Sequence, residues 1–282
     1  MLSPRAAAIA WNGNNGYLAS LSYAQLPRHG CQIGCDLMNT FLLLDGTTDC
    51  CASAEEGQIF VDCFMDALCK PETPRPKGEW KGASVAQSFM QRMLSFGTSD
   101  SCVRRFVDKM QQFCDGVVEQ AGDRSRGHIR DVETYFQLRR YTIGAYPCYT
   151  ILQHEMELPD EIYEHEVLRR LEQLATDMII LDNDLLSYNV EQARGDEAHN
   201  LVTVLMNQFN FSLQESIDWV GKHYERLMDE FLKVYSMIPT VFQGDEDVQR
   251  YAWGVGNWVR GNWQWSWEVS LPPFSFECRW RF

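Results

Sequence analysis

The chain has 282 residues, 45% of them hydrophobic, so it is long enough to bury one large core or two small ones. Its formal net charge of −14 argues against nucleic acid or an anionic membrane surface as the main partner, because both favour clustered Lys and Arg. An anionic substrate would therefore require metal ions and a few placed arginines.

No Gly/Ser-rich or Pro-rich linker divides the sequence, which predicts a single domain over residues 1–282. The ten cysteines lack the paired spacing of zinc sites, and we expect reduced, mostly buried thiols in a cytoplasmic protein. No segment reaches the ~18–20 consecutive apolar residues of a membrane span. The sequence therefore predicts no membrane span.

The apolar residues follow helical spacing almost throughout, without the alternation that is typical of strands. The pattern predicts an all-α fold, a single helical bundle with short loops. A loop is expected at residues 70–78, and a polar turn is expected between Gly122 and Gly127. We expect helices over residues 34–48, 55–68, from 84, 99–120, 128–141, from 159 towards 194, 196–206, 213–237 and 246–268.

Local signals mark the ends of two long helices in the second half of the chain. Pro159, followed by two acids, is expected to begin a helix that Gly195 ends as its C-cap. Ser212 and Glu215 form a capping box that opens a later helix, and Pro239 is expected to close it.

Three oxygen-bearing side chains, Asn183, Ser187 and Glu191, lie four residues apart near the end of the helix that begins at Pro159. Residues four apart share one face of an α-helix and are about 6 Å apart along its axis. An amide, a hydroxyl and a carboxylate on one face suit a hard cation such as Mg²⁺. The alternative is an ordinary solvated helix end. An EF-hand is excluded, because its glycine and final glutamate positions hold Ser187 and Ala193.

A second acidic pair, Asp45 and Asp49, stands four residues apart at the end of the most apolar predicted helix, with Phe41 one turn earlier. Two carboxylates in an apolar helix are costly to bury unless something neutralises them, and metal ions would do so. The alternative is that the helix ends near Asp45 and that residues 45–49 form a solvated turn.

Two further elements carry candidate binding groups. Arg139 and Arg140 precede a helix break at Gly144, and a guanidinium fork suits phosphate oxygens; ordinary surface charge is the alternative. The last predicted helix is crowded with tryptophan, whose electron-rich ring faces stabilise cations. Trp258, Asn262 and Trp265 share one face of it, although a core or interface helix has the same composition.

Taken together, these motifs resemble one family, the fungal class I sesquiterpene synthases of mushroom-type species. The segment from Asn183 to Glu191 is similar to the family's Asn/Ser/Glu metal motif, and its continuation YNVEQARGDEAHNLVT is also characteristic. Residues 45–49 resemble the aspartate-rich motif, and Leu138 to Gly144 resembles the segment with the diphosphate-sensing arginine and the helix-break effector. The similarity covers about residues 17 to 268.

The resemblance implies a Mg²⁺-dependent lyase that ionises farnesyl diphosphate and cyclises the resulting carbocation to a sesquiterpene. It implies a central cavity, three Mg²⁺ ions, and a monomer or homodimer with no nucleic-acid partner. Asp45 and Asp49 are expected to hold two ions, and Asn183, Ser187 and Glu191 the third. For the sensing arginine, Arg140 fits the spacing to Gly144 better than Arg139. The expected pocket residues are Phe41, Trp258, Asn262 and Trp265.

The sequence departs from the family at three places. Gly46 stands where an acid usually follows the first aspartate, and the chain begins late relative to the family. Residues 269–282 are atypical: two prolines replace the expected Arg-Tyr pair, which leaves Arg279 as a possible diphosphate ligand. The alternative function is therefore a shortened or mis-spliced relative that binds diphosphate without turnover. A prenyl chain-elongating transferase is a third option, although those enzymes use two aspartate-rich motifs.

Overall fold

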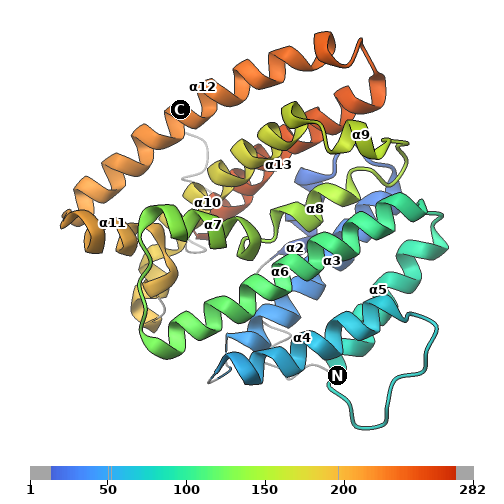
Figure 1. Cartoon of the computed structure of the whole chain (residues 1–282), viewed down its shortest axis with the longest axis horizontal. Coiled ribbons are helices and arrows are strands. Elements are labelled where there is room, and N and C mark those ends of the chain that lie inside the picture. Colours follow the sequence, from blue (N-terminus) through green and yellow to red (C-terminus); the bar gives the residue numbers. More distant parts are fainter. Residues whose placement is uncertain (1–13, 50, 52, 196, 271–282) are drawn as a thin grey trace, which may run out of the picture.

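The computed structural model describes residues 14–49, 51, 53–195 and 197–270, and helices account for most of them (Figure 1). No strand occurs in these ranges, so the predicted all-α fold is confirmed. The helices are α2 (Asn15–Ser22), α3 (Arg28–Thr48), α4 (Ala54–Cys69), α5 (Lys81–Ser95), α6 (Asp100–Arg126), α7 (Val132–Thr142), α8 (Ala145–Ile151), α9 (Asp160–Tyr163), α10 (Glu166–Arg194), the 3₁₀ turn η1 (Glu197–His199), α11 (Leu201–Phe209), α12 (Leu213–Val241) and α13 (Glu246–Ser270).

Helix α10 is the central element of the bundle. Every residue from 174 to 182 is buried, so α10 is covered on all sides there, as a helix inside a fold should be. It packs against α12 and α13, while α6 packs against α4, α7 and α8 (Figure 1). The predicted metal motif, from Asn183 to Glu191, directly follows this buried stretch on the last turns of α10.

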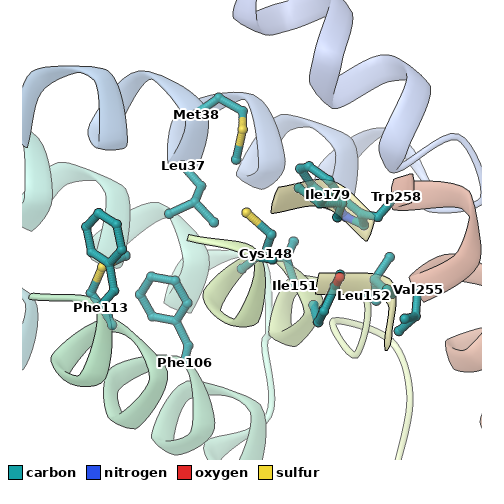
Figure 2. Close-up of a cluster of buried hydrophobic side chains, with 14 of the residues drawn as sticks. Leu37, Met38, Phe106, Phe113, Cys148, Ile151, Leu152, Ile179, Val255 and Trp258 are labelled. Carbon is teal, nitrogen blue, oxygen red and sulfur yellow. The ribbon is translucent and has the colours of Figure 1, made fainter. Parts of the chain in front are cut away.

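Side chains from five helices meet in one apolar cluster near the middle of the molecule. They are Leu37 and Met38 of α3, Phe106 and Phe113 of α6, Cys148 and Ile151 of α8, Ile179 of α10, and Val255 and Trp258 of α13 (Figure 2). The cluster holds α3 and α10, the helices of the two predicted metal motifs, around a common centre.

The predicted helix-capping signals are present. The Ser212 hydroxyl accepts from the Glu215 N–H, and the Glu215 carboxylate accepts from the Ser212 N–H at 2.8 Å, which completes the predicted capping box. Gly195 ends α10 in the left-handed conformation, with φ of +77°, as a C-cap glycine should.

The predicted end of the helix over Asp45 is confirmed, whereas the predicted start of the long helix at Pro159 was wrong. The helix over Asp45 continues to Thr48, so the alternative of a solvated turn at residues 45–49 is ruled out. The long helix does not begin at Pro159: α9 is one short turn, and α10 starts afresh at a cap made by His165, whose Nδ1 accepts from the Val167 N–H at 3.2 Å.

Two other predicted stops do not interrupt their helices. Gly122 lies inside α6, because a glycine in a long packed helix costs only about 1 kcal/mol. Pro239 lies in the last turn of α12, where few backbone hydrogen bonds remain to be lost.

The composition predicted reduced, mostly buried cysteines and no membrane span. The cysteines in this part of the chain are free. Burial raises the pKa of the Cys102 thiol to about 12, so this thiol stays protonated and inert. Over the same ranges, no helix has both the length and the apolar character that crossing a membrane requires.

Candidate active site

A polar hollow of about 350 Å³ lies between α3, α6, α7 and the end of α10. Its wall contains five of the residues predicted from the sequence, and they come from three different helices. They are Asp45 and Asp49 of α3, Arg139 of α7, and Asn183 and Glu191 of α10.

Asp45 and Asp49 lie on one face at the end of α3. Burial raises the pKa of Asp45 to about 7; the negative charge of Asp49 adds to the rise, and Arg139 opposes it. Asp49 is more open, with 63% of its side chain exposed and one oxygen 3.5 Å from Arg124. Gly46 between them is exposed, and a Cβ there would meet no atom within 4 Å, so this departure removes nothing from the wall of the hollow.

Asn183, Ser187 and Glu191 follow one another along the last turns of α10. The side-chain oxygen Oδ1 of Asn183 accepts from Arg139 at 2.7 Å, and Glu191 Oε2 accepts from Asn200 at 2.9 Å. Ser187 Oγ is buried beside the Glu191 carboxylate, one turn along the helix, and it stabilises the charged form of that carboxylate.

The two adjacent arginines point in different directions. Arg139 is 11% exposed and lines the hollow, where its Nε and Nη2 donate to Asp184 at 3.2 and 3.0 Å. Arg140 forms a bidentate pair with Asp177 at 2.7 and 2.9 Å and does not line the hollow. The ranking of Arg140 above Arg139 is thus not supported by this geometry, which favours Arg139 as the arginine that meets a ligand.

Gly144 lies at the break between α7 and α8, with φ of +72°. L-residues rarely adopt this conformation, and a Cβ there would also lie 3.3 Å from the Phe41 ring. Phe41 in turn makes an edge contact with Phe113, with ring centroids 4.8 Å apart. The break therefore requires glycine and is held against α3 and α6.

The other predicted pocket residues, Trp258, Asn262 and Trp265, belong to α13 and do not line the polar hollow. Trp258 belongs to the central apolar cluster (Figure 2). Its ring makes an edge-to-face contact with the ring of Tyr23, with ring centroids 5.1 Å apart. Trp258 Nε1 and Asn262 Nδ2 are buried without hydrogen-bond partners in the described part of the chain. Trp265 is half-buried against the same core. Arg279 lies outside the described residues.

Some residues at the hollow were not predicted from the sequence. Asp184 is 1% exposed and accepts from the Tyr135 hydroxyl, from Arg139 and from the Leu201 N–H at 3.0 Å. Asn200 holds Glu191 from the start of α11. Two sequence signals pointed to Asn200: its place in the characteristic stretch YNVEQARGDEAHNLVT, and its position as a capping residue just before an apolar run.

Additional arginines line the hollow beside Arg139. They are Arg124, Arg130 and Arg194. Arg124 donates to the Thr48 carbonyl at 3.0 Å and so ties the end of α3 to α6. The same wall carries the carboxylates of Asp45, Asp49, Asp123 and Glu191, so the hollow suits an anion that binds together with cations.

The predicted metal ligands fit Mg²⁺ in their chemistry, because all five present oxygen atoms. Among the described residues, no group of three or more His, Cys, Asp or Glu side chains is arranged to hold a metal ion. Cations at this site would therefore need further oxygen atoms from water or a bound anion. Asp45 and Asp49 on one side, and Asn183, Ser187 and Glu191 on the other, are the residues that could hold them.

Comparisons with known proteins agree with this chemistry. The family model "Terpene synthase family 2, C-terminal metal binding" matches residues 36–230. A Delta(6)-protoilludene synthase of Stereum hirsutum is 42% identical over 89% of this chain and 68% of its own length. A second, from Hypholoma sublateritium, is 45% identical over 85% and 73%. Sesquiterpene synthase 9 of Postia placenta is 41% identical over 89% and 73%.

Solved structures share the fold at lower sequence identity. Cucumene synthase superposes with a TM-score of 0.83 and 21% identity, over 95% of this chain and 90% of its own. A linalool/nerolidol synthase of Streptomyces clavuligerus gives a TM-score of 0.78 and 21% identity, over 92% and 88%. The fold is that of the class I terpene synthases. With the family match over most of its length, the chain belongs to terpene synthase family 2 and is an enzyme of the terpene cyclase kind.

Proposed function

We propose that this protein is a sesquiterpene synthase that ionises farnesyl diphosphate with Mg²⁺ and cyclises the resulting carbocation, releasing diphosphate. The observation that carries the proposal is the convergence of Asp45, Arg139, Asn183 and Glu191 on one hollow. The similarity to sesquiterpene synthases over most of the chain supports it. It does not favour the alternative of a relative that binds diphosphate without turnover.

The diphosphate would bind in the polar hollow. Bound Mg²⁺, three ions by the family resemblance, would neutralise the diphosphate and stabilise it as a leaving group while the carbon–oxygen bond ionises. Asp45 and Asp49 would hold cations on the α3 side, and Asn183, Ser187 and Glu191 on the α10 side. Arg139, fixed by Asp184, would donate to diphosphate oxygens through its remaining N–H groups.

The hydrocarbon chain would lie over the apolar cluster that Figure 2 shows. Phe41, Trp258 and Trp265 would present ring faces to the carbocation, which stabilises positive charge without supplying a nucleophile. The break at Gly144 joins Arg139 to the helix α8 that carries Cys148 and Ile151 of that cluster. A movement of Arg139 towards diphosphate would thereby reach the pocket and help to exclude water.

The test is incubation of the purified protein with farnesyl diphosphate and Mg²⁺, followed by gas chromatography with mass spectrometry. We expect sesquiterpene hydrocarbons that disappear when EDTA removes the metal. Delta(6)-protoilludene is the first product to look for, because several relatives are named for it. Failure to release any sesquiterpene, with circular dichroism showing a folded helical protein, would contradict the proposal. Geranyl diphosphate should be tested in parallel.

A further inference from the structure

Asn200, at the start of α11, uses all of its side-chain hydrogen-bonding groups inside the protein. It is 0% exposed, and its Oδ1 accepts from the Val202 N–H at 2.9 Å as the cap of α11. Its Nδ2 donates twice, to the Asp184 carbonyl at 2.8 Å and to Glu191 Oε2 at 2.9 Å. One buried amide thus joins α11 to two positions on α10.

The bond to Glu191 reaches a carboxylate that lines the hollow. Burial raises the pKa of Glu191, and hydrogen bonds from Ser187 and Asn200 act against that rise because they stabilise the charged form. Asn200 holds Oε2 of a carboxylate that faces the hollow. A residue behind a metal ligand commonly fixes the orientation of that ligand in this way.

The neighbouring residue strengthens the same link. The Leu201 N–H donates to Asp184 Oδ2 at 3.0 Å, and Asp184 directly follows Asn183 on α10. The first residues of α11 therefore hold α10 at both ends of the predicted metal triplet, next to Asn183 and at Glu191.

We propose that Asn200 is a positioning residue that orients Glu191 for Mg²⁺ and diphosphate. The inference rests on the proposed function, because it assumes that Glu191 is a metal ligand. The competing explanation is that Asn200 serves only as the cap of α11. Ser and Asp cap helices about as well as Asn. A role in capping alone therefore predicts that Asn200→Ser and Asn200→Asp leave Mg²⁺–pyrophosphate binding unchanged, whereas a positioning role predicts that both weaken it.

The experiment is calorimetric titration with Mg²⁺ and inorganic pyrophosphate, which needs no turnover. Asn200→Ser keeps a cap oxygen but removes the N–H donor to Glu191. Asn200→Asp keeps the cap oxygen but places a second carboxylate against that of Glu191. We expect both to weaken Mg²⁺–pyrophosphate binding by about tenfold or more, with Asn200→Asp the weaker binder. Excess Mg²⁺ should restore much of the turnover of Asn200→Ser.

A control variant and a double-mutant cycle separate the positioning of Glu191 from an effect on protein stability. Ser99→Ala removes the cap of α6 at its far end from the hollow, so it should lower the melting temperature and leave Mg²⁺–pyrophosphate binding unchanged. Combined with Glu191→Gln, Asn200→Ser should cause little further loss, because both changes act on one carboxylate. If Asn200→Ser does not fold, Asn200→Asp carries the same comparison.

Two results would overturn the inference. Wild-type protein that binds Mg²⁺–pyrophosphate, together with folded Asn200 variants that bind it equally well, would leave the proposed function intact and refute the positioning role. Additive losses in the cycle would also refute it. A wild-type protein that does not bind Mg²⁺–pyrophosphate would instead contradict the proposed function itself.

Discussion

Arg139 Nη2 donates to the side-chain oxygen of Asn183 at 2.7 Å, while Asp184 on the next position of α10 holds the same guanidinium. If Asn183 binds a cation through that oxygen, the cation and the arginine compete for it. Metal binding would then release one donor of Arg139 into the hollow, and Asp184 would keep the guanidinium in place. The two events, metal binding and contact with diphosphate, would be coupled by one hydrogen bond.

Arg139→Lys should lower turnover by about tenfold or more, because an ammonium cannot hold Asp184 and meet diphosphate as a planar fork does. The measurements are steady-state kinetics with farnesyl diphosphate and calorimetry with Mg²⁺–pyrophosphate. Arg140→Lys is the matched control: it disturbs the pair with Asp177 and should affect stability more than turnover. A larger kinetic loss at Arg140 than at Arg139 would reverse our assignment.

Removing the predicted metal ligands should abolish turnover with little loss of stability. Asn183→Leu, Glu191→Ala and Asp45→Ala should each leave about 1% of the activity or less, since ligand losses remove transition-state stabilisation. Asp49→Ala should be milder, because Asp49 is largely exposed. Product formation and thermal melting should be measured on the same samples. Near-normal activity in Asn183→Leu and Glu191→Ala would remove the metal assignment on α10.

Binding of Mg²⁺–pyrophosphate should depend on pH through Asp45. Its pKa of about 7 means that the ligand-free protein retains a proton on Asp45 that the unfolded chain has lost. Ionisation of Asp45 therefore makes the folded state less stable as pH rises towards about 7. A cation that binds Asp45 must also displace the proton from its carboxyl group. Affinity should increase from about pH 6 to about pH 8. Calorimetry in buffers of different ionisation enthalpy should detect proton release, and binding that is independent of pH would contradict this.

Asp182→Asn should stabilise the protein at alkaline pH. Asp182 is 8% exposed, and burial raises its pKa to about 7, opposed by a hydrogen bond with Tyr224. Above that pKa the buried charge is unfavourable, so the substitution should raise the free energy of unfolding by about 1–3 kcal/mol near pH 8. The gain should shrink progressively as the pH falls from about 7 and should disappear near pH 4, the ordinary pKa of an aspartate, because the folded state binds the proton over that range and the unfolded state does not. Urea denaturation at both pH values, with the exposed Asp229→Asn as control, checks this. A loss of stability at pH 8 would contradict it.

Asn262→Leu should change the products more than the stability. Asn262 is 6% exposed and its Nδ2 has no partner among the described residues, so a side chain of similar size removes no hydrogen bond from that atom. We expect a melting temperature equal to or above that of the wild type and an altered product ratio, because a barrier change of ~1.4 kcal/mol shifts a ratio tenfold. Trp263→Leu, on the exposed side of α13, is the control and should leave the ratio unchanged. An unchanged profile in Asn262→Leu would remove it from the predicted pocket.

The sequence predicted the helical fold and the residues that share a helix face, because both follow from the period of one helix. Asn183 and Glu191 are brought to one hollow for that reason. The ranking of Arg140 above Arg139 was not supported by the geometry, since adjacent residues point about 100° apart on a helix and the rotation of α7 is set by its packing. Distant partners such as Asn200 were also missed, because η1 and the start of α11 decide where that side chain lies.

The polar hollow and the apolar cluster share the helices α3, α6 and α10 but take residues from different turns of each. On α3, Met38 precedes Asp45 by seven residues, and on α10, Ile179 precedes Asn183 by four (Figure 2). Under the proposed function, mutations in the cluster would reshape the space around a reacting chain while leaving the diphosphate end of the site untouched. In evolutionary terms, such an arrangement would separate the residues that start the reaction from those that select its outcome, and it would let a lineage explore new products without first losing catalysis.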